Sequence, residues 1–181
     1  MLTQLQIQNF ESSFNVLDHN HDGTIDEMDL AGSAQSTCDA LGLTPDSPER
    51  AAMMGSYSRL WETIRLAADA DDDGRVSHDE YMAAGSALIR DDGYLEACAM
   101  VSDASFDSVD TDDDGAVSLD EVIHLYVSVG LDASAASAAF TQVDTNGDGQ
   151  VSRDEWRTAV VGIYLSDSPE GMGSNMFGHA K

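Results

Sequence analysis

Four twelve-residue segments of this chain repeat one pattern of polar side chains, and no other feature of the sequence limits the fold as strongly. Each segment has Asp at position 1, Asp or Asn at position 3, Asp at position 5, Gly at position 6 and a carboxylate at position 12. The segments span residues 18–29, 69–80, 110–121 and 144–155 and are called the first to fourth loops below. Four matches with the same glycine argue against ordinary solvated turns and for a structural repeat.

The spacing of the oxygen atoms in these loops suits a Ca²⁺ ion. Ca²⁺ binds about seven oxygens at roughly 2.3–2.6 Å, so a short loop has to turn several oxygens inward, and the glycine permits that turn. Positions 1, 3, 5, 7 and 12 are the expected ligands, with a direct or water-mediated contact from position 9. The predicted ligands are Asp18, Asn20, Asp22, Thr24 and Asp29; Asp69, Asp71, Asp73, Arg75 and Glu80; Asp110, Asp112, Asp114, Ala116 and Glu121; and Asp144, Asn146, Asp148, Gln150 and Glu155, where the residue at position 7 acts through its backbone carbonyl.

The first loop departs from the other three at position 12, where Asp29 replaces Glu. Its side chain is one methylene shorter, so we expect one oxygen rather than two to reach the ion. A lower coordination number suits Mg²⁺, which prefers six ligands. Asp26 at position 9 adds a compensating charge. We therefore predict three to four bound Ca²⁺ ions, with the first loop the weakest Ca²⁺ site and the one most open to Mg²⁺.

Apolar residues at three- and four-residue spacing predict a helix on each side of every loop, and hence an all-α fold. The expected helices span residues 3–17, 30–43, 49–68, 81–90, 94–109, 122–129, 133–143 and 156–165. A β-branched residue stands at position 8 of every loop, namely Ile25, Val76, Val117 and Val151. Such residues favour a short antiparallel contact between paired loops, and we pair the first loop with the second and the third with the fourth.

This pairing divides the chain into an N-terminal pair over residues 1–90, a C-terminal pair over residues 91–165 and a tail over residues 166–181. The tail has Pro and Gly enough to be irregular, but it also carries Met172, Met176 and Phe177. These apolar residues favour a tail that packs over the cavity between the helices, and the alternative is a frayed terminus.

The composition limits the possible partners and the location of the protein. Its net charge is −26, which argues against nucleic acid and anionic membranes as partners, and four Ca²⁺ ions would reduce it to about −18. Metal should therefore relieve repulsion between carboxylates, and folding should be coupled to metal binding. No basic start and no long apolar run is present, so we expect a cytoplasmic protein. We also expect a monomer, with Cys38 and Cys98 as buried free thiols.

The loops resemble those of EF-hand proteins, and the whole chain resembles the sarcoplasmic calcium-binding proteins and their bacterial relatives, the calerythrins. The loop starts are separated by 51, 41 and 34 residues, and a long first interval is similar to the layout of that family. The segment at residues 164–178, Y-L-S-D-S-P-E-G-M-G-S-N-M-F-G, resembles the family's ending. The resemblance implies two EF-hand pairs packed into one compact domain. This chain departs from the family in its second loop, which has every ligand position filled here and is often degenerate in relatives.

The leading functional interpretation is a cytoplasmic Ca²⁺-binding protein of the buffering or Ca²⁺-transporting type, without catalysis of its own. A first alternative is a Ca²⁺ sensor, which would expose a methionine-rich groove to an unknown target protein, and the eight methionines permit it. A second alternative follows from the photoproteins and luciferin-binding proteins among the relatives. It is a carrier of an apolar small molecule, for which Tyr57, Trp61, Tyr81, Tyr126, Trp156 and His124 are candidate pocket residues.

Overall fold

A computed structural model describes residues 2–128 and 132–165, and within them eight helices and four short strands are joined by loops. This confirms the predicted all-α class. The elements, in order, are α1 Gln4–Leu17, β1 Thr24–Ile25, α2 Glu27–Ala40, α3 Pro48–Ala68, β2 Val76–Ser77, α4 His78–Leu88, α5 Asp92–Val109, β3 Ala116–Ser118, α6 Leu119–Ser128, α7 Ala133–Val143, β4 Gln150–Ser152 and α8 Arg153–Leu165.

The helices that leave the loops begin three residues earlier than the sequence analysis placed them, at position 10 of each loop. The reason is a helix cap. In the second loop, Ser77 at position 9 accepts a hydrogen bond from the N–H of Glu80, and the Glu80 carboxylate accepts one from the N–H of Ser77. This reciprocal arrangement is a capping box, which satisfies N–H groups at the start of a helix. The last three loop residues are therefore already helical.

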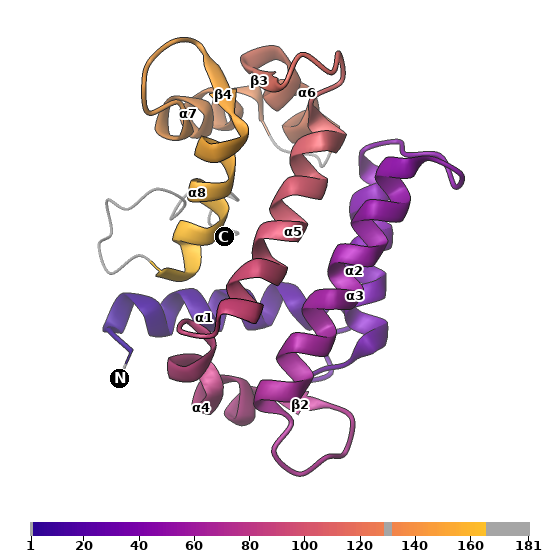
Figure 1. The fold of residues 1–181 in the computed structure, drawn as a ribbon, viewed down its shortest axis with the longest axis vertical. Coiled ribbons are helices and arrows are strands. Elements are labelled where there is room, and N and C mark those ends of the chain that lie inside the picture. The colour runs from indigo at the N-terminus through magenta and orange to yellow at the C-terminus, as the bar shows by residue number, and fades with distance from the viewer. Residues whose placement is uncertain (1, 129–131, 166–181) are drawn as a thin grey trace.

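The predicted pairing of the loops is confirmed. Strand β1 runs antiparallel to β2 with Ile25 opposite Val76, and β3 runs antiparallel to β4 with Val117 opposite Val151. The two paired contacts lie at opposite ends of the molecule, with β3 and β4 at the top of Figure 1 and β2 at the bottom. The β-branched side chains are buried in the cores of their own pairs.

The cores of the two pairs meet along α5, which runs beside α3 through the middle of the molecule (Figure 1). Tyr94, Ala97 and Cys98, from the first half of α5, belong to the N-terminal core. Phe106 and Val109, from its second half, belong to the C-terminal core. One helix thus contributes to both cores, which holds the two pairs together in one compact domain.

A smaller buried cluster joins α2, α3 and α5 through Cys38, Met53 and Ala104. Cys38 and Cys98 are both buried free thiols, as predicted. The expected packing of the 166–181 tail lies outside the described residues. Among the residues that the structure describes, no helix is both long and apolar enough to cross a membrane.

Candidate metal centres

The four loops share one pattern of internal hydrogen bonds, which turns their acidic and amide side chains inward. In the third loop, the N–H of Asp114 donates to Asp110 Oδ1 at 3.2 Å and to Asp112 Oδ1 at 3.3 Å. The N–H of Gly115 donates to Asp110 Oδ2 at 3.0 Å, and the N–H of Ala116 donates to Asp114 Oδ1 at 2.9 Å. Backbone donors thereby hold the side chains at positions 1, 3 and 5 around one point.

Most of these contacts recur in the other loops, although in the fourth loop the Oδ1 of Asp144 accepts from the N–H of Gly147, at position 4. The N–H at position 6 donates to the carboxylate at position 1, and the N–H at position 7 donates to the carboxylate at position 5, in every loop. The N–H at position 5 donates to the side-chain oxygen at position 3, including that of Asn20 in the first loop and Asn146 in the fourth. The amide residues therefore present an oxygen where the other loops present a carboxylate.

The backbone supports this turn by adopting positive φ at two positions of every loop. The glycine at position 6 has φ between 82° and 89° in all four loops. Position 4 also has positive φ, with values of 58° at His21, 59° at Asp72, 57° at Asp113 and 71° at Gly147. Glycine adopts this region without strain, and Asp and His are among the residues that tolerate it best.

The geometry of the second and third loops fits Ca²⁺. Asp69, Asp71 and Asp73 each offer a carboxylate oxygen within 4.8 Å of the other two, and Asp110, Asp112 and Asp114 do the same. Two oxygens bound to one Ca²⁺ are at most about 5 Å apart, twice the metal–oxygen distance. These three side chains offer oxygen ligands, as a hard dication requires. When bound, the ion would supply the positive charge that the clustered carboxylates lack.

The glutamates at position 12 reach back over their loops. In each glutamate, Oε1 accepts a hydrogen bond from the backbone N–H of position 2, at 2.8–3.0 Å, and Oε2 accepts hydrogen bonds from the N–H and the hydroxyl of the serine at position 9. The three glutamates are Glu80, Glu121 and Glu155. Hydrogen bonds from the backbone and hydroxyl of Ser152, with those from Thr145 and Asn146, lower the pKa of Glu155 to about 2. Each glutamate is therefore held as a charged carboxylate facing its loop.

Asp29 occupies the same position in the first loop but lies deeper. Its side chain is 1% exposed, and its oxygens accept hydrogen bonds from the N–H groups of Asn20 and Asp26, at 3.1 and 2.9 Å. The shorter side chain contacts the N–H of position 3, whereas the glutamates contact the N–H of position 2, and Glu155 also accepts from the N–H of Asn146 at position 3, at 3.3 Å. Burial raises the pKa of the Asp29 carboxyl and outweighs its hydrogen bonds.

The serine at position 9 has a role that the sequence analysis missed. We expected a direct or water-mediated metal contact there. In the structure, the hydroxyls of Ser77, Ser118 and Ser152 also donate to the position-12 glutamate, at 2.7–2.8 Å, and the metal contact stays a prediction. Asp26 caps α2 in the first loop, where its Oδ1 accepts from the N–H groups of Met28 and Asp29. A Ser or Asp three residues before an acidic residue is the sequence signal for this capping box.

Position 7 places two loops in contact. The guanidinium of Arg75 in the second loop lies 3.8 Å from the carboxylate of Asp22 in the first. Thr24, Arg75, Ala116 and Gln150 lie at or beside the paired strands, and their carbonyl oxygens remain the predicted ligands. The Arg75 contact brings a positive side chain beside a predicted ligand of the neighbouring loop, which sequence spacing does not reveal.

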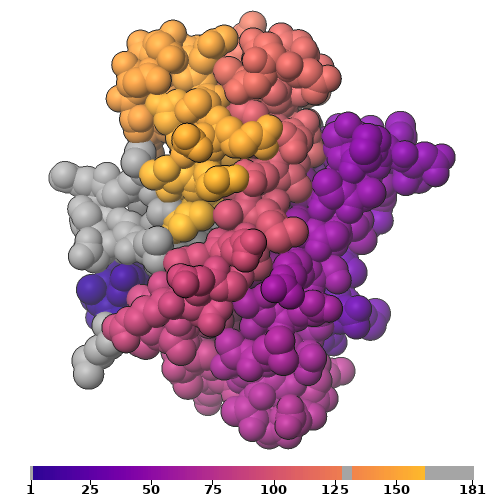
Figure 2. Space-filling model, viewed as in Figure 1, coloured from indigo at the N-terminus to yellow at the C-terminus, as the bar shows by residue number. Residues whose placement is uncertain are grey.

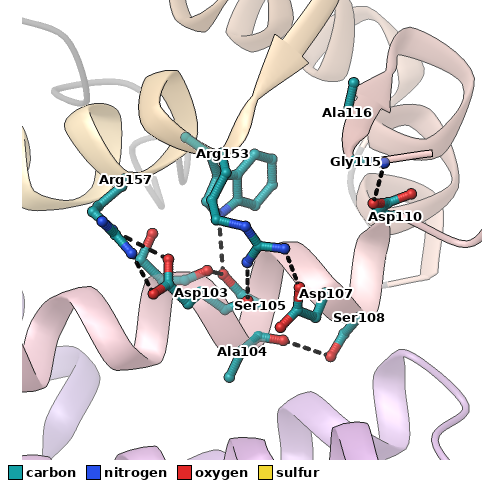
Figure 3. A network of polar contacts seen from close by, with 12 residues as sticks. Asp103, Ala104, Ser105, Asp107, Ser108, Asp110, Gly115, Ala116, Arg153 and Arg157 are labelled. Atoms are coloured by element: carbon teal, nitrogen blue, oxygen red, sulfur yellow. Dashed lines mark hydrogen bonds and ion pairs between the residues drawn. The ribbon is translucent and has the colours of Figure 1, made fainter. Parts of the chain in front are cut away.

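Two arginines join α8 to α5 within the C-terminal pair (Figure 3). Arg157 donates to both carboxylate oxygens of Asp103, at 3.2 and 2.5 Å. Arg153 pairs with Asp107 and lies over the ring of Phe106, 4.3 Å from its centre. The indole N–H of Trp156 donates to Ser105 at 3.0 Å. These contacts hold α8, which leaves the fourth loop, against α5, which enters the third loop.

An apolar cavity of about 530 Å³ lies between the C-terminal pair and the far end of α2 and α3. In Figure 2 the end of α2 and α3 projects beside the C-terminal pair at the upper right, and the surface between them is indented. Tyr57, Tyr126 and Trp156 line the cavity, as the carrier hypothesis expected. The other candidate pocket residues lie elsewhere, because Trp61 and Tyr81 are buried in the N-terminal core and His124 is exposed.

Comparison with known proteins agrees with this geometry. The EF-hand family model matches residues 10–31, 66–84, 103–126 and 137–161, which together contain all four loops. A search of curated proteins gives no significant match.

Solved structures share the fold. A calcium-binding protein of Streptomyces coelicolor, described in connection with prokaryotic calcium-mediated regulation, is 27% identical with a TM-score of 0.74, over 88% of this chain and 97% of its own. The amphioxus sarcoplasmic calcium-binding protein is 21% identical with a TM-score of 0.75, over the whole of both chains. The coelenterazine-binding protein of Renilla muelleri is 23% identical with a TM-score of 0.62, over 97% of this chain and 98% of its own. The chain therefore belongs to the EF-hand family of calcium-binding proteins, and its fold is the one found in the sarcoplasmic calcium-binding proteins.

Proposed function

We propose that this protein is a cytoplasmic Ca²⁺ buffer or carrier of Ca²⁺ ions without catalytic activity. The observation that supports buffering is the shared core along α5. The apolar interior of the N-terminal pair is covered by Tyr94, Ala97 and Cys98 of that helix. A sensor must expose such a surface to a target when Ca²⁺ binds. Here the surface is already occupied by another part of the same chain, which favours ion storage over target recognition.

In this proposal the loop residues bind the ion and the helices hold the loops. Carboxylate and amide oxygens at positions 1, 3 and 5, the carbonyl at position 7 and the carboxylate at position 12 replace the water around the ion. The backbone N–H groups that hold these side chains reduce the ordering needed on binding. The pairing of Val117 with Val151 places the third and fourth loops side by side, so that ordering one loop favours the other.

A calorimetric titration of the metal-free protein with Ca²⁺, with and without Mg²⁺, tests the proposal. We expect three to four ions, and fewer than three would contradict it. Glu80→Gln, Glu121→Gln and Glu155→Gln should each weaken one site, since each removes a charge that faces a loop. Asp120→Asn is the matched control, because it removes the same charge at an exposed residue beside Glu121 and should leave every site intact.

A hydrophobic dye separates a buffer from a sensor. If the 166–181 tail packs over the cavity as predicted, adding Ca²⁺ to the folded, Mg²⁺-loaded protein should not raise dye fluorescence. A strong rise would favour the sensor.

A second candidate function is the carriage of an apolar small molecule. The observation that favours it is the cavity between the C-terminal pair and the end of α2 and α3, whose volume of about 530 Å³ falls within the usual range for ligand sites. Binding of a small apolar probe by the Ca²⁺-loaded protein, with one molecule per chain, is the expected result. Ion buffering and carriage are compatible, since the cavity and the ion-binding loops use different side chains.

A further inference from the structure

A positive side chain of the second loop lies beside a predicted ligand of the first loop. The guanidinium of Arg75 is 3.8 Å from Oδ2 of Asp22, and both side chains are exposed to solvent. The other oxygen of Asp22, Oδ1, accepts hydrogen bonds from the N–H and the hydroxyl of Thr24, at 3.0 and 2.7 Å. Both oxygens of this carboxylate therefore face a positive or a hydrogen-bond-donating group of the protein.

The position-5 carboxylate has a simpler environment in the other three loops. There it accepts a hydrogen bond from the N–H of position 7, as Asp22 also does. Within the described part of the chain, Asp22 is the one predicted ligand that forms an ion pair with an arginine. The first loop therefore differs from the other loops at position 5 as well as at position 12.

The register of the paired strands explains why Arg75 lies near the first loop. Ile25 lies opposite Val76, so the next two residues in this antiparallel register are Asp26, at position 9 of the first loop, and Arg75, at position 7 of the second. The matching residues of the C-terminal pair are uncharged, with Ala116 opposite Ser152 and Ser118 opposite Gln150. Arg75 thus offsets the negative charge that Asp26 adds to the first loop.

The size of the electrostatic effect follows from Coulomb's law. One positive charge roughly 6–8 Å from a dication in water weakens the binding of that dication by about 5- to 10-fold at low salt. Screening reduces the factor to about 2- to 4-fold at about 0.1 M salt, because the guanidinium is exposed. The backbone carbonyl of Arg75 is also a predicted ligand of the second loop. The same residue thus serves one loop through its backbone and opposes the other through its side chain.

From these contacts we infer that Arg75 sets the order in which the two sites of the N-terminal pair fill, because its charge weakens cation binding in the first loop. The inference rests on the Ca²⁺-binding function proposed above, and it adds a second cause, besides Asp29, for a weak first site. The two causes differ in selectivity. A nearby charge acts alike on Ca²⁺ and Mg²⁺, whereas the short side chain of Asp29 disfavours Ca²⁺ in particular.

Arg75→Gln tests the inference in the full-length protein, because it removes the charge and keeps the backbone carbonyl. The N–H of the position-6 glycine donates to the position-1 carboxylate of its own loop, so the amide NMR signal of Gly23 reports the first loop and that of Gly74 the second. The intensity of each ion-bound signal is measured against chelator-buffered free Ca²⁺. We expect the first loop to bind Ca²⁺ about 5- to 10-fold more tightly at low salt, with a smaller gain at about 0.1 M salt. Mg²⁺ should gain by a similar factor.

Two variants serve as controls. Arg75→Lys keeps the positive charge and should keep the original affinity of the first loop. Arg59→Gln removes the same charge from a side chain of similar exposure, 51% against 54% for Arg75. Arg59 lies on α3 and pairs with Glu62, outside the loops, so its loss should change neither signal. Circular dichroism of the Ca²⁺-loaded variants checks that each is folded.

The outcomes separate the inference from the function on which it rests. If Arg75→Gln leaves the first loop unchanged, or tightens the second loop alone, the inference is overturned and ion binding by the protein stands. A gain for Ca²⁺ without a gain for Mg²⁺ would also overturn it, because a charge does not distinguish the two ions. An empty first loop at saturating Ca²⁺ would do the same. Fewer than three ions in the calorimetric titration would instead reject the proposed function.

Discussion

The short side chain of Asp29 at position 12 is expected to limit the Ca²⁺ affinity of the first loop. It is buried, and its carboxylate accepts hydrogen bonds from the N–H groups of positions 3 and 9. We predict that Asp29→Glu restores a two-oxygen contact, tightens Ca²⁺ at this loop roughly tenfold and reduces competition by Mg²⁺. Calorimetric titration with and without Mg²⁺ measures both effects.

Asp120→Glu provides the control, since it adds the same methylene at an exposed residue outside the predicted ligand set. If Asp29→Glu leaves the weakest Ca²⁺ affinity unchanged, the limit on the first site lies elsewhere in the loop.

Substitution of glycine by alanine should have opposite effects on stability at two positions of this chain. Gly149 has φ of 85° and Gly55 lies in the helical backbone of α3, and neither has an atom within 4 Å of the place where a Cβ would stand. Gly149→Ala should therefore act through backbone strain alone, lowering the free energy of unfolding of the Ca²⁺-loaded protein by about 1–2 kcal/mol. Gly55→Ala should raise it by up to about 1 kcal/mol, through helix propensity. Thermal denaturation of both variants measures the contrast, and a destabilised Gly55→Ala protein would show that α3 is constrained in another way.

At the scale of elements, the thiol of Cys98 reports on the packing of α5. Burial raises its pKa to about 12, so almost no thiolate exists at pH 8. We expect Cys98 in the Ca²⁺-loaded protein to react with a disulfide reagent at pH 8 only as fast as the protein opens. Chelation of Ca²⁺ should accelerate labelling, because α5 then loses its packing against the N-terminal pair. Cys38→Ala isolates the Cys98 signal, and fast labelling in Ca²⁺ would contradict a fixed α5.

Sequence reasoning predicted those elements whose cause is local. The ligand pattern and the β-branched residues at position 8 lie within each loop, so the four loops and the pairing of Val117 with Val151 follow from spacing alone. The starts of the exit helices were misplaced because the position-12 glutamate was considered only as a ligand, although it is also a capping residue. The cavity depends on where α2 and α3 pack against the other pair. The Arg75–Asp22 contact has no signal in local sequence either, because its two residues lie in different loops.

At the scale of the whole molecule, charge and packing oppose one another. The chain has 34 acidic and 8 basic residues, and many of the acidic residues are predicted ligands that lie close together in the loops of both pairs. We predict that removing Ca²⁺ with a chelator expands the protein, because the carboxylates then repel each other without a counter-ion. Hydrodynamic radius, measured by light scattering at low salt, should increase and should decrease again when Ca²⁺ is restored. Equal radii in both conditions would refute the coupling of metal to folding.

The double use of the position-12 glutamate links each loop to the start of its exit helix. Glu80 caps α4 by accepting hydrogen bonds from Ser77, and Glu121 and Glu155 hold their serines in the same way. The costly step in forming a helix is its first turn, and the capping glutamate helps to close that turn. One residue is therefore both a predicted ligand and part of the helix nucleus, so a substitution at position 12 should weaken the exit helix as well as the affinity of its loop.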